Sequence, residues 1–376
     1  MKKKCWVALV LTAFLFVLAA CGGANSPKDS AGSGTNANSS SNHANSGSDS
    51  NPASNSGSGS NTGSDSGTGS ETYKIAISQI AEHPSLDATR EGFLAALADA
   101  GIVEGENLEV DYNNAQDDPA NNLSIAQKLA SSDADLILAI STPSAQAIVQ
   151  QVTDKPVMFA AVTDPLDAKL VADLEKPGGN VTGASDTNPE AIRMLMDFIA
   201  KELPNVKNVG VVINEGEPNA VVMADIAAEA LAEHGIGLVK APVTNTSEVK
   251  QAAESLVGRA DALYITLDNK VVGAKETILQ IANENDIPFF ASDRDTVEAG
   301  AFATVGFEYY DHGYEAGQMA VEILKYGANP GDMAVTFPSK LDFILNLQAA
   351  KEQNIEVTDA MKAYVKDQEN NLIGAE

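Results

Sequence analysis

The sequence predicts an α/β protein with two similar lobes, each a parallel β-sheet covered by helices on both faces. From Tyr73 onward, short apolar segments alternate with longer segments of helical periodicity, and this alternation runs through the chain twice. The apolar segments are continuous instead of alternating with polar residues, which is typical of parallel strands buried on both faces. The roughly 300 residues after Tyr73 are enough for two such lobes.

The first series begins with the predicted strand YKIAISQI and the predicted helix HPSLDATREGFLAALADAG. In that helix Leu86, Phe93 and Leu97 recur at helical spacing, Pro84 suits the first turn and Gly101 ends it. The series continues as alternating strands and helices: NLEVDYNNA, NNLSIAQKLASS, ADLILAIS, PSAQAIVQQVT and PVMFAAV.

The second series starts after the segment DAKLVADLEKPGGNVTG and repeats the same order of strand and helix. It ends in a long helix that runs through Lys325. Its predicted elements are KNVGVVIN, NAVVMADIAAEALAEHG, IGLVKAPV, SEVKQAAESLVGR, ADALYITLD, VVGAKETILQIANEND, IPFFASD and AFATVGFEYY.

Polar side chains follow most of the predicted strands. In doubly wound sheets, ligands bind beyond the carboxyl ends of the strands, next to helix N-termini. The strand ends carry Ser78, Gln79, Ser141, Thr142, Ser144, Thr163, Asp164, Ser185, Asp186, Asn214, Glu215, Thr266, Asp268, Asn269, Ser292 and Asp293. Hydroxyls and amides there suit a carboxylate, and Asp268 or Asp293 suits an ammonium group. The alternative for each residue alone is an N-cap, the commonest use of these residue types at a helix start.

We expect the strand-end residues of both lobes to converge on one cleft. If Asp268 and Asp293 contact the ligand, replacing either with alanine weakens binding and leaves the melting temperature nearly unchanged.

The N-terminus predicts a secretory signal peptide over residues 1–20. MKKK is basic, WVALVLTAFLFVLAA is apolar and short for a membrane span, and Ala19 and Ala20 are small. LAAC also resembles the bacterial lipobox, which implies that Cys21 carries a lipid anchor. An ordinary cleaved signal with a chance cysteine is the alternative.

Residues 21–72 are predicted to be the lipidated cysteine and a linker. Gly22 to Glu71 contain no Val, Ile, Leu, Met or aromatic residue. Such a segment cannot bury enough apolar surface to offset the entropy of ordering, so we expect a flexible coil.

Composition excludes several function classes. A formal charge of −28 makes nucleic acid a poor partner, and two cysteines, one of them in the signal, exclude a disulfide scaffold. The chain has no G-x-S-x-G, H-E-x-x-H or Walker motif. We therefore expect no catalytic residues, metal or cofactor. A hydrolase that uses the cleft carboxylates is the weakest alternative.

Several segments together resemble the ABC-transporter substrate-binding proteins of the tryptophan/tyrosine-type uptake family. They are ISQIAEHPSLDATREGF, AISTPSAQA, AAVTDPLDAKLV, EKPGGNVTGASD, YITLDNKVV, FFASD and TVGFEYYDHGYEAGQMAVEIL. The resemblance implies a type I periplasmic-binding-protein fold with Rossmann-like lobes and a three-strand hinge. It also implies an aromatic amino acid as ligand, and a permease with its ATPase as partners. The positions that match the family's motifs are Gln79, Thr142, Asp164, Asp186, Asp268, Asn269 and Asp293.

The family pattern implies hinge crossings near Asn180 to Thr187, near Ala299 to Ala301 and near Phe337. Lobe 1 is then expected to hold residues 73–184 and 300–336, and lobe 2 residues 185–299 and 337–376. We expect a monomer, lipid-anchored to the outer face of the cytoplasmic membrane. Strand-end and family considerations together give the candidate ligand-binding set Gln79, Thr142, Ser144, Asp164, Asp186, Asn214, Asp268, Asn269 and Asp293. The candidates for an apolar ligand wall are Ile80, Phe159, Phe307 and Tyr310. A sensor that presents its ligand to a receptor remains an alternative function.

Overall fold

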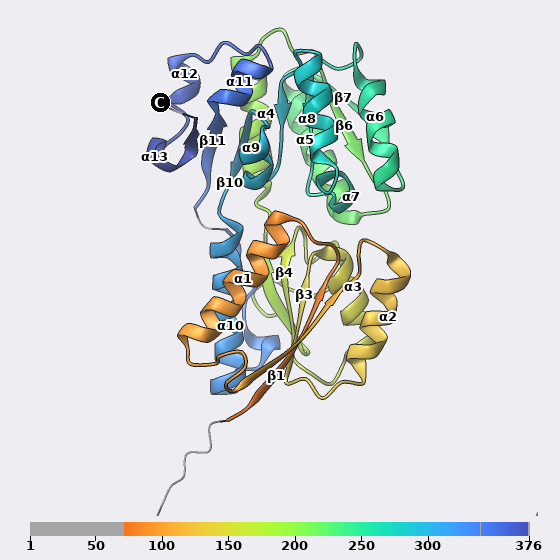
Figure 1. Cartoon of the computed structure of the whole chain (residues 1–376), viewed down its shortest axis with the longest axis vertical. Helices are drawn as coiled ribbons and strands as arrows, with labels where there is room; N and C mark the ends of the chain where they lie inside the picture. Colours follow the sequence, from red (N-terminus) through yellow and green to blue (C-terminus); the bar gives the residue numbers. More distant parts are fainter. Residues whose placement is uncertain (1–70, 339, 375–376) are drawn as a thin grey trace, which may run out of the picture. The chain divides into compact units, whose positions relative to one another are not determined.

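The computed structural model describes residues 71–338 and 340–374, which form two sheets flanked by helices (Figure 1). The predicted signal peptide, Cys21 and all but the last two residues of the predicted linker lie outside the described residues.

The first sheet has five parallel strands in the order β2-β1-β3-β4-β5. Helices α1 and α10 pack on one face, while α2 and α3 pack on the other. The strands are β1 (Tyr73–Gln79), β2 (Leu108–Asn114), β3 (Leu136–Ile140), β4 (Val157–Val162) and β5 (Val181–Ser185). The helices are α1 (Pro84–Asp99), α2 (Pro119–Ala130), α3 (Thr142–Gln151) and α10 (Tyr309–Tyr326). Ile75 and Ile77 face the core under α1, whereas Ala76 faces the core under α2. Burial on both faces explains the continuous apolar runs.

The second sheet has seven strands in the order β12-β11-β10-β9-β8-β6-β7, and only the β10–β11 pair is antiparallel. Helices α4 and α5 bury one face, and α6 and α8 bury the other. The strands are β6 (Asn208–Ile213), β7 (Gly237–Pro242), β8 (Ala262–Tyr264), β9 (Phe289–Phe290), β10 (Ala303–Gly306), β11 (Asp342–Asn346) and β12 (Leu372–Ile373). The helices are α4 (Pro189–Glu202), α5 (Pro218–Glu233), α6 (Val249–Leu256), α7 (Asn269–Val272), α8 (Lys275–Glu284), α9 (Arg294–Ala299), α11 (Leu347–Glu352), α12 (Asp359–Lys362) and α13 (Gln368–Asn371).

The chain passes between the two sheets three times. The first passage follows β5, the second lies between β10 and α10, and the third lies between Thr336, which bridges to Ala184, and β11. The second passage differs from the expected one near Ala299 to Ala301. Strand β10 was expected in lobe 1, but it pairs with β9 and β11 of the second sheet. Because Ala303 and Val305 are buried in the core of that sheet, the crossing follows Gly306.

Helices α1 and α10 lie side by side in the first lobe (Figure 1). Glycines make this close approach possible. A Cβ atom built on Gly313 would lie 1.9 Å from the carbonyl oxygen of Thr89, and one on Gly92 would lie 2.0 Å from that of Tyr310. The two helix backbones therefore touch directly, and no larger residue fits at these positions without moving a helix.

Among the helices in the described part of the chain, none is both long enough and apolar enough to span a bilayer.

Candidate ligand-binding site

A pocket lies between the two lobes, and we call it the central cavity; its empty space of about 330 Å³ includes open solvent. Four of the predicted residues line it: Thr142 at the start of α3, Asp186 after β5, Asn269 at the start of α7 and Asp293 before α9. The other lining residues are His83, Ser85, Leu86, Ser141, Ala161, Thr163, Asn219, Leu267, Val272 and Tyr309. The strand ends of both lobes therefore converge on one site, as the sequence predicts.

Asn269 links the two lobes at this cavity. Its Nδ2 donates to Oε2 of Glu217 in lobe 2 at 2.6 Å and to Oγ of Ser141 in lobe 1 at 3.1 Å. Its Oδ1 lies 3.5 Å from Nε2 of His83. Burial lowers the pKa of His83 to about 4, so this imidazole is neutral at pH 7.

Two further contacts join the lobes beside the cavity. Ser85 Oγ, at the start of α1, donates to Asp295 Oδ2 at 2.6 Å. Lys270 Nζ forms an ion pair with Asp117 Oδ1 at 2.7 Å, and both side chains are largely buried. These contacts require the lobes to be close together, so the structure shows the cleft closed.

Two helices of lobe 1 present positive ends to the cavity. Within the described chain, no side chain caps the N-terminus of α1 or of α3, at which His83 and Ser141 hold the N-cap positions. Ser141 has φ +80° and ψ 152°, a backbone conformation that strongly favours glycine and costs about 1–3 kcal/mol. Uncapped N–H groups at two helix starts, with the helix dipoles behind them, are suited to a carboxylate.

Two buried carboxyl groups line the same cavity. Asp186 Oδ2 accepts a hydrogen bond from the Tyr309 hydroxyl at 3.2 Å, and Asp186 Oδ1 accepts one from Thr187 Oγ1 at 3.0 Å. Asp293 caps α9 by accepting from the backbone N–H of Thr296 at 2.8 Å. Burial raises the pKa of each of these carboxyl groups to about 6. Both are mainly ionised at pH 7 and suited to an ammonium group.

Two buried polar atoms at the cavity have no partner in the described chain: Nδ1 of His83 and Oδ1 of Asn219. The Asn219 amide nitrogen is used, since it donates to the carbonyl oxygen of Leu267 at 2.6 Å and to Glu217 Oε2 at 3.2 Å. Buried polar groups without a partner are rare because leaving them unpaired costs free energy. A ligand with a hydrogen-bond donor would satisfy Asn219.

A second, mostly apolar pocket adjoins the central one where the passages between the sheets meet lobe 2, and we call it the side cavity. Its empty space of about 360 Å³ includes open solvent, and it shares Asp186 and Leu267 with the central cavity. Its other lining residues are Thr187, Asn188, Ala191, Ile192, Leu195, Met223, Tyr264, Ala291, Ser292, Thr304, Val305, Phe307 and Leu341. Of the expected apolar ligand wall, Phe307 lies here, whereas Phe159 is buried in the core and Tyr310 is exposed.

Five predicted residues line neither cavity, because they bond to their own surroundings. Gln79 donates to Ala81 O and Asp87 Oδ1, and Ser144 donates to Asn122 on α2. Asp164 accepts from the backbone N–H groups of Leu166 and Asp167. Asn214 and Asp268 bond mainly within lobe 2, at the ends of β6 and β8. The capping alternative describes Asp164 and Asp268 well.

Asp268→Ala is expected to lower the free energy of unfolding by about 2 kcal/mol. The fully buried carboxyl group accepts from the backbone N–H groups of Asn214, Lys270 and Val271, all of which would lose their acceptor. Burial and the neighbouring Glu217 carboxylate raise the pKa of Asp268. Urea denaturation measures the loss, and an unchanged midpoint would show that these bonds contribute no net stability. This expectation replaces the earlier one of weaker binding with an unchanged melting temperature.

Sequence reasoning missed Ser85, Asn219, Leu267 and Tyr309 in its candidate set. Asn219 lies one residue inside α5, and Tyr309 begins α10 after the second passage between sheets. The candidates were chosen among the first polar residues after each predicted strand, whereas Asn219 and Tyr309 lie further along the chain. Their position in a helix start was the only available signal.

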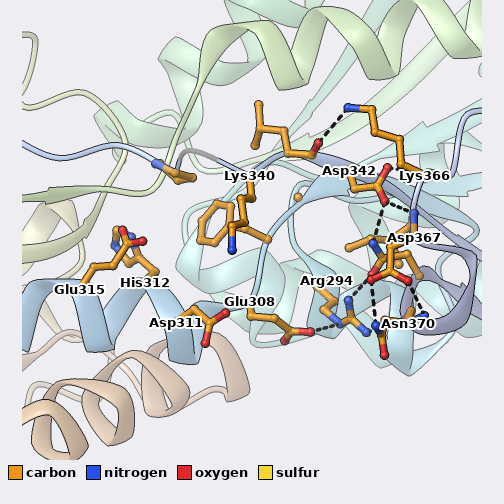
Figure 2. Close-up of a pocket in the computed structure, with 16 residues that line it drawn as sticks. Arg294, Glu308, Asp311, His312, Glu315, Lys340, Asp342, Lys366, Asp367 and Asn370 are labelled. Atoms are coloured by element: carbon orange, nitrogen blue, oxygen red, sulfur yellow. Dashed lines mark hydrogen bonds and ion pairs between the residues drawn. The ribbon is translucent and has the colours of Figure 1, made fainter.

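A larger groove, with about 1360 Å³ of empty space that includes open solvent, lies beside the passages between the sheets (Figure 2). Charged groups in it bond to one another: Arg294 Nε lies 3.0 Å from Glu308, and Asp342 accepts from the backbone N–H groups of Lys366 and Asp367. In the described chain, none of the unpartnered buried side-chain atoms belongs to its lining residues. The central cavity is therefore the better ligand site.

Comparisons with known proteins agree with this geometry. The family model described as "ABC transporter substrate binding protein" matches residues 74–368. A protein of Clostridioides difficile (strain R20291) named "Tyrosine-binding protein" is 40% identical over 297 residues, which cover 79% of this chain and 85% of the relative.

Two solved structures differ in a way that bears on closure. An ABC domain from Streptococcus pneumonia in complex with L-Trp is 30% identical to this chain. The match covers 79% of this chain and 99% of that chain, with a TM-score of 0.75. The ligand-free, open structure of a substrate binding protein with adhesive properties from Clostridium difficile is 40% identical to this chain. The match covers 80% of this chain and 98% of that chain, with a TM-score of 0.60. The ligand-bound structure is the more similar in shape despite its lower identity, which fits the closed cleft.

Proposed function

This chain belongs to the family of ABC transporter substrate-binding proteins, and we propose that its ligand is an aromatic L-amino acid. Proteins of this family bind a small solute and deliver it to the permease of their transporter. The fold, two parallel-dominated sheets, is that of type I periplasmic binding proteins. The relatives named for tyrosine binding and for a complex with L-Trp support an aromatic ligand.

One observation supports the proposal: groups that suit each of the three parts of such a molecule lie in or beside the closed cleft. The uncapped starts of α1 and α3 suit its carboxylate. The carboxyl groups of Asp186 and Asp293 and the free Asn219 Oδ1 suit its ammonium group. The mostly apolar lining of the side cavity suits an aromatic ring, and the two cavities share Asp186.

The test is the identity of the molecule that the protein carries when it is purified without denaturation. The expected mass spectrum of the acid-released ligand shows tyrosine, tryptophan or phenylalanine at about one molecule per chain. A sugar, a nucleoside or an aliphatic amino acid at that stoichiometry would contradict the aromatic assignment.

Affinity for the amino acid is expected to fall at least about tenfold between pH 7 and pH 5. Asp186 and Asp293, whose pKa values burial raises to about 6, lose their charge over this range, and a neutral acid no longer attracts the ammonium group. His83 has a pKa of about 4, so it stays neutral throughout. Calorimetric titration at both pH values measures the change. An affinity that is flat from pH 7 to pH 5 would exclude an ammonium partner among these acids.

We also propose that the protein is a carrier without enzymatic activity, acts outside the cytoplasmic membrane as a monomer, and is anchored there by a lipid on Cys21. The LAAC sequence and the family support this arrangement. The mass of the N-terminal peptide from membrane-purified protein tests the anchor: an unmodified Cys21, or a different N-terminus, would contradict it.

A further inference from the structure

One ion pair joins the two lobes away from the cavities. Lys270 of α7, in lobe 2, places its Nζ 2.7 Å from Oδ1 of Asp117, in the loop between β2 and α2 of lobe 1. The same Nζ donates to the backbone carbonyl oxygen of Asp117 at 3.0 Å. Asn269 and Ser85 also join the lobes, but both line the central cavity, whereas Lys270 and Asp117 line neither cavity. We therefore expect this pair to affect binding through closure and not through ligand contact.

The backbone of lobe 1 holds Asp117 in place for this contact. Gln116 and Asp117 both adopt the left-handed conformation, with φ +54° and +56°, which is uncommon for residues other than glycine. The N–H of Asp117 donates to the carbonyl oxygen of Ile80 at 2.7 Å, and that of Gln116 donates to Asn114 Oδ1 at 2.7 Å. The fixed loop presents two acceptors of Asp117, its carbonyl oxygen and its carboxylate, to one ammonium group of lobe 2.

Lobe 2 fixes the position of Lys270 through the cap of α7. The backbone N–H of Lys270 donates to Oδ1 of Asp268, which caps this helix, at 3.1 Å. Among the described residues, the Lys270 ammonium group has no acceptor in its own lobe, and the Asp117 carboxylate has no other hydrogen-bond partner. The pair therefore forms only when the lobes are together, and its interaction free energy favours the closed state alone.

We propose that Lys270 and Asp117 form a latch that holds the cleft closed and sets how long the ligand stays bound. A ligand held between two lobes is released as they separate. Its apparent affinity is proportional to the population of the binding-competent closed state, which the latch raises. Differences in affinity of this kind appear mainly in the dissociation rate. The inference rests on the proposed function for its probes, which are aromatic amino acids.

The experiment measures the release of tritiated L-tyrosine and L-tryptophan after dilution into excess unlabelled ligand. It compares the unmodified protein with Asp117→Asn, Lys270→Met and the double variant. Each single variant removes one charge and leaves the other enclosed between the lobes, so we expect release to be about tenfold faster. The double variant should release ligand no faster than the faster single variant, because both changes break the same contact. Calorimetric titration should show a matching loss of affinity.

The matched control is Lys128→Met, which breaks an ion pair of 2.9 Å with Asp111 that lies entirely within lobe 1. It should release ligand at the unmodified rate. Asparagine tolerates the left-handed backbone at position 117, so Asp117→Asn should fold normally, which circular dichroism checks.

Release at the unmodified rate from both single variants would overturn the latch and leave the proposed function standing. Losses that add in the double variant would also overturn it, because they would indicate two independent effects. If the unmodified protein binds no aromatic amino acid, the proposed function fails. The latch then still predicts that Asp117→Asn loses its co-purified molecule faster during dialysis than Lys128→Met, and equal loss by mass spectrometry would overturn it.

Discussion

Asp186→Asn is expected to weaken binding of the aromatic amino acid by about 100-fold or more. The carboxyl group lies where the central and side cavities meet, and it is almost completely buried. A buried charge pair that loses one partner leaves the other uncompensated, at a cost of about 2–5 kcal/mol. Calorimetric titration at pH 7.5 measures the loss.

The change at Asp186 should not destabilise the protein. Asparagine keeps an oxygen that can accept from Tyr309, and burial already disfavours the charge, as the raised pKa of Asp186 shows. The matched control is Asp164→Asn, another strand-end acid of lobe 1 that lines neither cavity. It should bind normally. Normal binding by Asp186→Asn, or an equal loss in the control, would remove Asp186 from the site.

Gly313→Ala is expected to lower the free energy of unfolding by about 3 kcal/mol or more. The new methyl group would lie 1.9 Å from the carbonyl oxygen of Thr89, which belongs to the backbone of α1 and cannot rotate away. One of the two helices must therefore shift, and the packing of α10 on α1 is lost locally. Urea denaturation with a linear extrapolation measures the change.

The control for Gly313→Ala is Gln318→Ala, an exposed position of the same helix, with an expected change within about 0.5 kcal/mol. A Gly313→Ala variant as stable as the unmodified protein would mean that α1 and α10 do not approach as closely as described.

Most of the fold follows from sequence patterns because strands buried on both faces leave a continuous apolar signature. Ile75, Ala76 and Ile77 illustrate this, since consecutive side chains enter opposite cores. The sheet to which β10 belongs could not be predicted from the sequence, because the segment Ala303–Gly306 has the pattern of a strand in either sheet. Its pairing with β11, nearly 40 residues further along the chain, places β10 in the second sheet.

The candidate site was predicted only in part, for a physical reason. A polar residue after a strand can face the cleft or turn back to cap its own helix, and residue type does not distinguish these roles. Asp293 does both, whereas Asp268 only bonds within lobe 2.

The central claim is that the closed cleft binds an aromatic amino acid, and the fluorescence anisotropy of L-tryptophan tests it most directly. Trp6 is the only tryptophan in the sequence, so a chain that starts at Cys21 contributes no tryptophan emission. We predict a saturable rise in anisotropy that corresponds to one site per chain and is reversed by excess L-tyrosine. No rise with tryptophan, together with no heat of binding for tyrosine or phenylalanine, would contradict the claim.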